Sequence, residues 1–288
     1  MSLPPTAPSS HRALRQWSDL CTTDFSSLDP ERTVAVLPVA ATEQHGPHLP
    51  LSVDTDLVEG VLAAAGGHLD DAWPVYVLPT QAIGLSTEHR GFAGTLTLRP
   101  ETVLALWMDI GASVARAGVR KLLLVNSHGG HVGIMDVVGR ELRTQHGLLV
   151  YSTSWYTLPL TDRHGGDAQS LISAHEQRFG IHAGQVETSM MLALRPDTVR
   201  MAHAQRFTST AEDRARHYPV LGNGRSAKLS WQMQDYNPQG AAGDAAAANR
   251  ELGATLIDAA GRSLAQLLEE VCRLPLDTLK PSPLGTTE

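Results

Sequence analysis

Four short apolar segments alternate with stretches of helical pattern, and this alternation restricts the fold more than any other feature of the sequence. The segments are shorter than most buried helices and consist mainly of β-branched and aliphatic residues, which predicts strands. They cover residues 33–41, 75–79, 121–125 and 148–151. The helices expected between them cover residues 56–66, 100–118 and 132–145. Strands and helices in this order form right-handed crossovers, so we predict an α/β fold whose mainly parallel sheet is covered on both faces.

The rest of the chain has a less regular pattern. We expect further helices at residues 12–20, 183–194 and 244–272. Residues 156–181 read as a polar insertion, and residues 200–242 contain little regular pattern. The Pro/Ser-rich segment 1–10 is expected to be loose, and a Pro-rich tail, 274–288, closes the chain. Because the sequence contains no internal repeat and no linker, we treat residues 1–288 as a single domain.

Composition and charge exclude several classes of protein. The 288 residues are 42% hydrophobic and 18% charged, which is typical of a globular protein. A net charge of -7 without any basic run argues against binding to nucleic acid or to an anionic membrane. Two cysteines are too few for a disulfide framework or a thiolate metal site. We find neither a signal peptide nor an apolar run of ~18 residues, so we expect a soluble, cytoplasmic protein.

The first polar motif follows the first predicted strand. Glu43 and His45 are two residues apart, so in an extended chain they point to the same side. Asp54 follows after two prolines that exclude a helix from the connecting loop. Two carboxylates and an imidazole that converge in this way form a ligand set for a divalent metal. The alternative is a polar loop in which Asp54 or Thr55 caps the next helix.

Two later segments supply side chains of the same kind. His128 and His131 follow the strand at 121–125 in a glycine-rich loop, at the sheet edge where α/β folds bind their ligands. The alternative there is a turn with incidental histidines. Glu187 lies near the start of the helix at 183–194, where it is either a metal ligand or a complement to the helix dipole. His182, just before that helix, could carry a proton.

Together these segments supply more ligands than one open zinc site uses. The candidates are Glu43, His45, Asp54, His128 and Glu187. Such a set fits two metal ions that share a carboxylate and a hydroxide, and we expect Asp54 to be the bridge. Nitrogen and oxygen ligands without thiolate suit Zn²⁺, Mn²⁺ or Fe²⁺. A metal pair of this kind activates water and polarises a carbonyl, which indicates hydrolysis.

Four motifs in order resemble the creatininase (creatinine amidohydrolase) family. They are Glu43-Gln-His-Gly-Pro-His-Leu-Pro with Asp54, Glu88-His-Arg-Gly-Phe-Ala-Gly-Thr95, Asn126-Ser-His-Gly-Gly, and His182-Ala-Gly-Gln-Val-Glu-Thr-Ser189. The resemblance implies a three-layer α/β/α sandwich, a binuclear metal centre, hydrolysis of non-peptide or cyclic amide C–N bonds, and a homohexamer. By the same resemblance, His182 matches an acid/base histidine, and four residues match metal ligands: Glu43, His45, Asp54 and His128.

This chain departs from creatinine-specific members at two positions. Gly130 stands where those enzymes carry a metal-binding Glu, and Arg178 stands where they carry a Trp. The Gly-Gly form resembles formamide hydrolases and a peptide-trimming member of mycofactocin maturation, in which Glu187 would supply the missing ligand. His131 and Gln185 also differ from the residues common in the family, and either could alter the metal preference.

The favoured hypothesis is a metal-dependent amidohydrolase that acts on a small-molecule amide or formamide. His182 and Glu187 would handle protons and the metal-bound water, and the expected substrate contacts are Ser86, Glu88, His89 and His131. One alternative is a peptide-trimming metallopeptidase, and another is a catalytically silent, metal-stabilised binding or assembly protein. A small closed pocket lined by Trp155 or Trp231 would indicate a small amide, and an open groove would indicate a peptide.

Overall fold

The computed structural model describes residues 14–283, and its centre is a five-stranded sheet. The strand order is β1-β3-β2-β4-β5, and every neighbouring pair is parallel. The strands are β1 (Arg15–Gln16), β2 (Val34–Val39), β3 (Val75–Val77), β4 (Lys121–Asn126) and β5 (Leu149–Ser154). The four predicted strands and the parallel sheet are therefore confirmed. The expectation of a loose segment at 1–10 lies outside the described residues.

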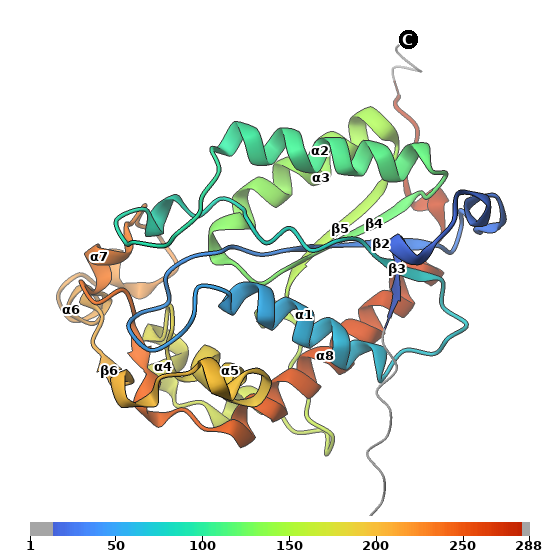
Figure 1. The fold of residues 1–288 in the computed structure, drawn as a ribbon. Coiled ribbons are helices and arrows are strands. Elements are labelled where there is room, and N and C mark those ends of the chain that lie inside the picture. Colours follow the sequence, from blue (N-terminus) through green and yellow to red (C-terminus); the bar gives the residue numbers. More distant parts are fainter. Residues whose placement is uncertain (1–13, 284–288) are drawn as a thin grey trace, which may run out of the picture.

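Helices cover both faces of this sheet, which gives the three-layer arrangement (Figure 1). One layer consists of α2 (Pro100–Arg116) and α3 (Val132–His146). The other contains α1 (Val53–Gly66), α5 (Gln185–Leu194) and α8 (Arg250–Arg273). Alternate residues of β2 enter the two cores: Val34 and Val36 pack on the α1/α8 side, and Ala35 and Leu37 on the α2/α3 side. A strand buried on both faces explains the continuous apolar run in the sequence.

Smaller elements lie beyond the carboxyl ends of the strands, on the left in Figure 1. They are α4 (Ala174–Phe179), α6 (Thr210–His217), α7 (Met233–Tyr236) and the antiparallel pair β6 (Arg206–Phe207) and β7 (Gly243–Asp244). The polar insertion and the irregular region of the sequence therefore contain more regular structure than expected. Short amphipathic segments of this kind carry too few turns for a clear periodic signal.

Three predicted boundaries were wrong. The expected helix at 12–20 is absent over residues 14–20: Arg15 and Gln16 pair with Tyr76 and Val77 of β3, and a 3-10 turn, Trp17–Asp19, follows. Pairing with β1 satisfies backbone N–H and C=O groups along the edge of β3, and the local sequence does not reveal that this edge is available. Helix α1 begins at Val53 rather than 56, so Asp54 lies in its first turn. Helix α8 begins only at Arg250, because β7 and a 3-10 turn occupy residues 243–247.

A buried lysine joins the last helix to the sheet. Lys121, the first residue of β4, is fully buried. Its Nζ donates to the carbonyl oxygens of Val271, Cys272 and Leu274 at distances of 3.0, 2.8 and 2.6 Å. Val271 and Cys272 belong to the last turn of α8 and Leu274 directly follows it, so the ammonium caps the negative end of the helix dipole. Among the described helices, none is both long and apolar enough to cross a membrane.

Candidate metal centre and active-site cavity

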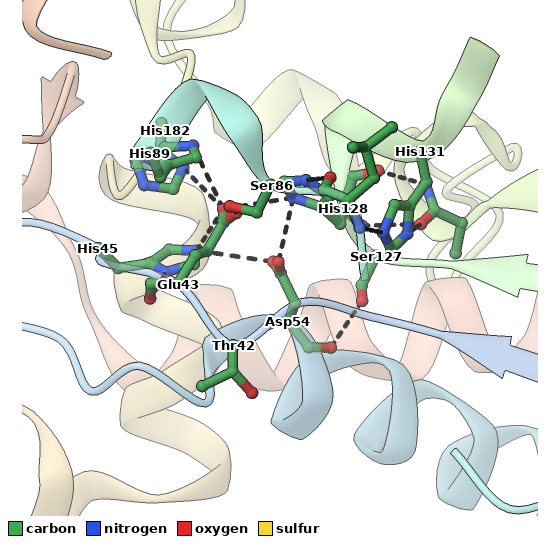
Figure 2. A network of polar contacts seen from close by, with 12 residues as sticks. Thr42, Glu43, His45, Asp54, Ser86, His89, Ser127, His128, His131 and His182 are labelled. Carbon is green, nitrogen blue, oxygen red and sulfur yellow. Dashed lines mark hydrogen bonds and ion pairs between the residues drawn. The ribbon is translucent and has the colours of Figure 1, made fainter. Parts of the chain in front are cut away.

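The candidate metal ligands meet at the carboxyl ends of the strands, as Figure 2 shows for most of them. Glu43 and His45 follow β2, and His128 follows β4. Asp54 enters from the first turn of α1, and Glu187 from the first turn of α5. In a parallel α/β sheet this edge is where loops and helix N-termini converge. Side chains from four separate segments therefore face one point.

The distances define three overlapping groups of candidate ligands. His128 Nδ1 lies 3.3 Å from Glu43 Oε1 and 3.2 Å from Asp54 Oδ2. His45 Nε2 lies 3.5 Å from Asp54 Oδ1. In each of the groups Glu43–Asp54–His128, His45–Asp54–Glu187 and Glu43–His45–His182, the candidate ligand atoms lie within 4.8 Å of one another. Asp54 belongs to the first two groups and turns a different oxygen toward His128 than toward His45, as a carboxylate shared by two ions would.

Backbone hydrogen bonds set the tautomers of the two imidazoles. His45 Nδ1 donates to the carbonyl oxygen of Glu43 at 3.1 Å, and His128 Nε2 donates to the carbonyl oxygen of Leu85 at 2.9 Å. Because a carbonyl can only accept, the opposite ring nitrogens carry the lone pairs in the neutral rings. Those nitrogens are His45 Nε2 and His128 Nδ1, which face Asp54. This is the arrangement by which proteins orient histidine ligands of a metal.

The charges and unpaired atoms of the site fit a divalent cation. His45 Nε2 and Asp54 Oδ2 are buried and have no hydrogen-bond partner among the described residues. Burial lowers the pKa of His45, but Asp54, Glu187 and Glu43 together raise it to about 9. Burial raises the pKa of Glu187 to about 7, and Asp54 and Glu43 add to that rise against the opposing effect of His45. The site therefore has a surplus of negative charge that protons or metal ions must balance.

Two further histidines border the centre. His182 Nε2 donates to the carbonyl oxygen of Gln44 at 2.8 Å, which leaves Nδ1 facing Glu43 Oε1 at 3.9 Å. Burial lowers the pKa of His182 well below its usual range, and the neighbouring His45 and His89 lower it further. Gln44 Nε2 donates to His89 Nδ1 at 2.7 Å, and His89 Nε2 lies 3.4 Å from Glu43 Oε1. His182 therefore enters the site as a neutral imidazole with a free lone pair.

Two of the four expected substrate contacts lie elsewhere. Ser86 is fully buried, does not line the cavity, and donates its hydroxyl hydrogen to Glu43 Oε2. His131 is fully buried against Trp107, with ring centroids 5.0 Å apart. Its Nε2 accepts from the Leu85 amide at 3.0 Å, and its Nδ1 bonds Asn126 Oδ1 at 3.1 Å. Ser86 and His131 thus contact candidate ligands and their loops and do not line this cavity, and their contact with substrate stays a prediction.

A cavity of about 710 Å³ lies over the candidate ligands. Glu88 and His89 line it, as do three aromatic residues, Trp155, Tyr156 and Trp231. It extends to Lys228 and Leu229 in an exposed segment. Sequence reasoning missed Tyr156, although its place two residues beyond the carboxyl end of β5 is a signal that could have identified it. Both tryptophans line a cavity within the usual size range of ligand sites.

Comparison with known proteins assigns the chain to a family. The family model described as "Creatininase: Creatinine amidohydrolase" matches residues 18–268. The chain belongs to the creatininase family. This family membership makes it a hydrolase that acts on C–N bonds.

Relatives within the creatininase family differ in their named substrates. The chain is 33% identical over 194 residues to a mycofactocin precursor peptide peptidase of Mycobacterium ulcerans (strain Agy99), covering 66% of this chain and 69% of that protein. It is 31% identical over 179 residues to creatinine amidohydrolase of Pseudomonas putida, covering 58% and 66%.

Solved structures share the fold of this creatininase-family chain. A protein of Bacteroides fragilis NCTC 9343 has a TM-score of 0.69 at 23% identity and covers 91% of this chain and 98% of its own. A creatininase described as the Mn form has a TM-score of 0.63 at 23% identity, covering 88% and 97%. A creatininase variant described as the Zn-Zn type has a TM-score of 0.62 at 23% identity, covering 88% and 96%.

Proposed function

We propose that this chain is a metal-dependent amidohydrolase that uses two divalent ions to cleave the C–N bond of an amide. One observation carries the proposal: two groups of candidate ligands share Asp54 at the base of the cavity. The buried atoms without partners, His45 Nε2 and Asp54 Oδ2, support the same assignment. Related creatininases with Mn or Zn in their descriptions favour these metals.

The proposed ligand sets follow from the two groups that contain Asp54. Glu43, Asp54 and His128 would hold one ion, and His45, Asp54 and Glu187 the other. Glu187 would replace the ligand that creatinine-specific relatives carry at position 130. When bound, a pair of this kind supplies a hydroxide near neutral pH and polarises the amide carbonyl.

His182 is the proposed proton carrier. Its Nε2–H is tied to the Gln44 carbonyl, so Nδ1 is the nitrogen that can accept a proton. The residue lines the cavity, and its depressed pKa keeps the ring neutral before the reaction. It would take a proton from the attacking water and pass it to the leaving nitrogen, which departs as an amine.

A peptide or an extended amide is a second candidate for the substrate. The cavity of about 710 Å³ runs from the candidate ligands to the exposed Leu229, which is room for more than a small cyclic amide. The similarity to mycofactocin precursor peptide peptidases favours the same reading. Arg178 stands where creatinine-specific members carry a Trp, and it does not line the cavity. The cavity wall therefore has no side chain from this position.

The test combines metal analysis with two variants of α1. Asp54→Ala removes the shared ligand, and Asp56→Ala removes a nearby carboxylate that pairs with Arg195 outside the cavity. We expect two metal ions per wild-type chain and per Asp56→Ala chain, and loss of metal from Asp54→Ala. Turnover of amides in a screen of small amides, formamides, lactams and short peptides should fall by roughly a thousandfold or more in Asp54→Ala.

The outcomes separate the hypotheses. Equal turnover by wild type and Asp54→Ala would refute metal-assisted hydrolysis at this centre. A single metal without an exchangeable water, and no turnover, would favour a silent metal-stabilised protein. Cleavage of peptides in preference to small amides would favour the second candidate.

Assembly and location stay predictions. We propose a homo-oligomer, a hexamer by family resemblance, which light scattering coupled to size-exclusion chromatography would measure. The cytoplasmic location and the single-domain organisation are likewise expected, and fractionation and limited proteolysis would check them.

A further inference from the structure

The carboxylate of Glu88 occupies the space left by the missing side chain of Gly130. A Cβ atom built on Gly130 would lie 2.2 Å from Glu88 Oε1 and 2.4 Å from His128 Nε2. No side chain fits at position 130 unless the Glu88 carboxylate and the His128 ring both move. The observed position of the Glu88 carboxylate therefore requires glycine at position 130, although the two residues lie in loops that are distant in the sequence.

Glu88 is also the cavity carboxylate that neither belongs to a proposed ligand set nor accepts hydrogen bonds from the backbone amides of distant residues. Five carboxylates line the cavity: Glu43, Asp54, Glu88, Glu176 and Glu187. Three belong to the proposed ligand sets. Glu176 accepts the amides of Gln185 and Asp244 at 2.7 and 2.8 Å, so its charge is stabilised by backbone donors.

The contacts of Glu88 leave its carboxylate available to a ligand. Its Oε1 lies 3.4 Å from His128 Nε2, but that N–H already donates to the Leu85 carbonyl oxygen at 2.9 Å. Within residues 14–283, no lysine or arginine forms an ion pair with Glu88. Its side chain is 14% exposed and lines the cavity beside the candidate ligand His128. The one lysine of the lining, Lys228, lies in the exposed segment.

We propose that Glu88 selects the charge of the substrate: it accepts hydrogen bonds from an ammonium or N–H group next to the scissile amide and excludes a carboxylate there. This inference rests on the proposed amidohydrolase function and names the substrate class. A fixed negative charge in a partly buried wall attracts a cationic substituent and repels an anionic one much more strongly than it would in water. The preferred substrates are amino-substituted amides, and amides with a carboxylate next to the scissile bond are disfavoured.

The experiment compares one neutral amide that the wild type hydrolyses with two derivatives of it. The derivatives carry an amino or a carboxyl group on the carbon next to the scissile carbonyl, as in the series glycolamide, glycinamide and malonamic acid. The variant Glu88→Gln keeps the shape and removes the charge. Glu59→Gln removes an exposed carboxylate of α1 outside the cavity and controls for the overall charge change.

We expect the wild type and Glu59→Gln to prefer the amino derivative to the carboxyl derivative. In Glu88→Gln the ratio of their kcat/KM values should fall by roughly tenfold to a hundredfold. Turnover of the neutral amide should change much less. Metal content and the midpoint of thermal unfolding report whether each variant is folded, and Glu88→Asp, which retains the charge, should keep the wild-type order.

Two results would overturn the inference. One is an unchanged ratio in Glu88→Gln, and the other is an equal loss for all three amides, which would assign Glu88 to the chemistry or to the fold. Both leave the proposed function standing, because the wild type still hydrolyses the neutral amide. Failure of the wild type on every amide of the screen would instead count against the proposed function.

Discussion

Metal binding is expected to release protons from the ligands of the centre. An imidazole coordinates a metal through a deprotonated nitrogen. In the metal-free site, burial lowers the pKa of His45, but the surrounding carboxylates raise it to about 9. Burial also lowers the pKa of His128, while Glu43 and Asp54 hold it well above its usual range. Both rings therefore carry an extra proton at pH 7, which each metal must displace.

The number of protons released follows from these pKa values. Each imidazole gives up one proton, and Glu187, with a pKa of about 7, is about half protonated at pH 7. Loading both metals at pH 7 should release roughly two to three protons per chain from these side chains, and up to about one more from a metal-bound water. Since the pKa of His45 is about 9, its neutral form is scarce at pH 7. Between pH 7 and about 9 the affinity of the metal that uses His45 should therefore rise about tenfold per pH unit, and below pH 7 it should rise more steeply, because Glu187 of the same set is then protonated as well.

Isothermal titration calorimetry measures this release directly. Zn²⁺ or Mn²⁺ is titrated into metal-stripped protein at pH 7 in buffers that differ in protonation enthalpy, and the slope of observed heat against that enthalpy counts protons. His45→Gln should lower the count by about one. His203→Gln, which removes an exposed histidine, should leave it unchanged. A slope near zero for the wild type, or the same slope in His45→Gln, would refute the claim that His45 and His128 give up protons when they bind metal.

Two further predictions concern support for the fold and for the ligands. Lys121→Ala removes three hydrogen bonds from a buried ammonium and should lower the free energy of unfolding by about 3 kcal/mol in denaturant titrations. The exposed Lys228→Ala should change it by less than about 0.5 kcal/mol, and similar effects of the two would contradict the capping role. Ser86→Ala removes the hydrogen bond to Glu43 and should weaken metal affinity by roughly tenfold, with little change in KM. A raised KM at unchanged metal affinity would instead indicate that Ser86 contacts the substrate.

The local sequence pattern was sufficient to predict most strands of the sheet. Strand β4 is apolar from Leu122 to Val125 because both of its faces are buried, and β2 is apolar throughout for the same reason. The N-terminal segment shows where pattern failed. Residues Arg15–Gln16 are exposed and too short for a periodic signal, and they become a strand only because the edge of β3 is available to them.

The sequence likewise predicted only part of the arrangement of the candidate site. Glu43, His45 and His128 directly follow predicted strands, so their convergence followed from strand position alone. His131 was predicted to contact the substrate beside the candidate ligand His128, yet the turn between them places its ring against Trp107. Side-chain direction in a 3-10 turn depends on dihedral angles that residue type does not specify.

By itself the sequence determined the parallel α/β sheet, the family and the set of side chains that gather at the carboxyl edge, because these depend on periodicity and on order along the chain. Only the tertiary structure decided which of those side chains face the cavity. It paired Asp54 with both ligand groups, turned Ser86 toward Glu43, and laid Glu88 over Gly130. Such contacts join loops that are far apart in sequence, and their geometry is set by packing at distances of a few ångströms.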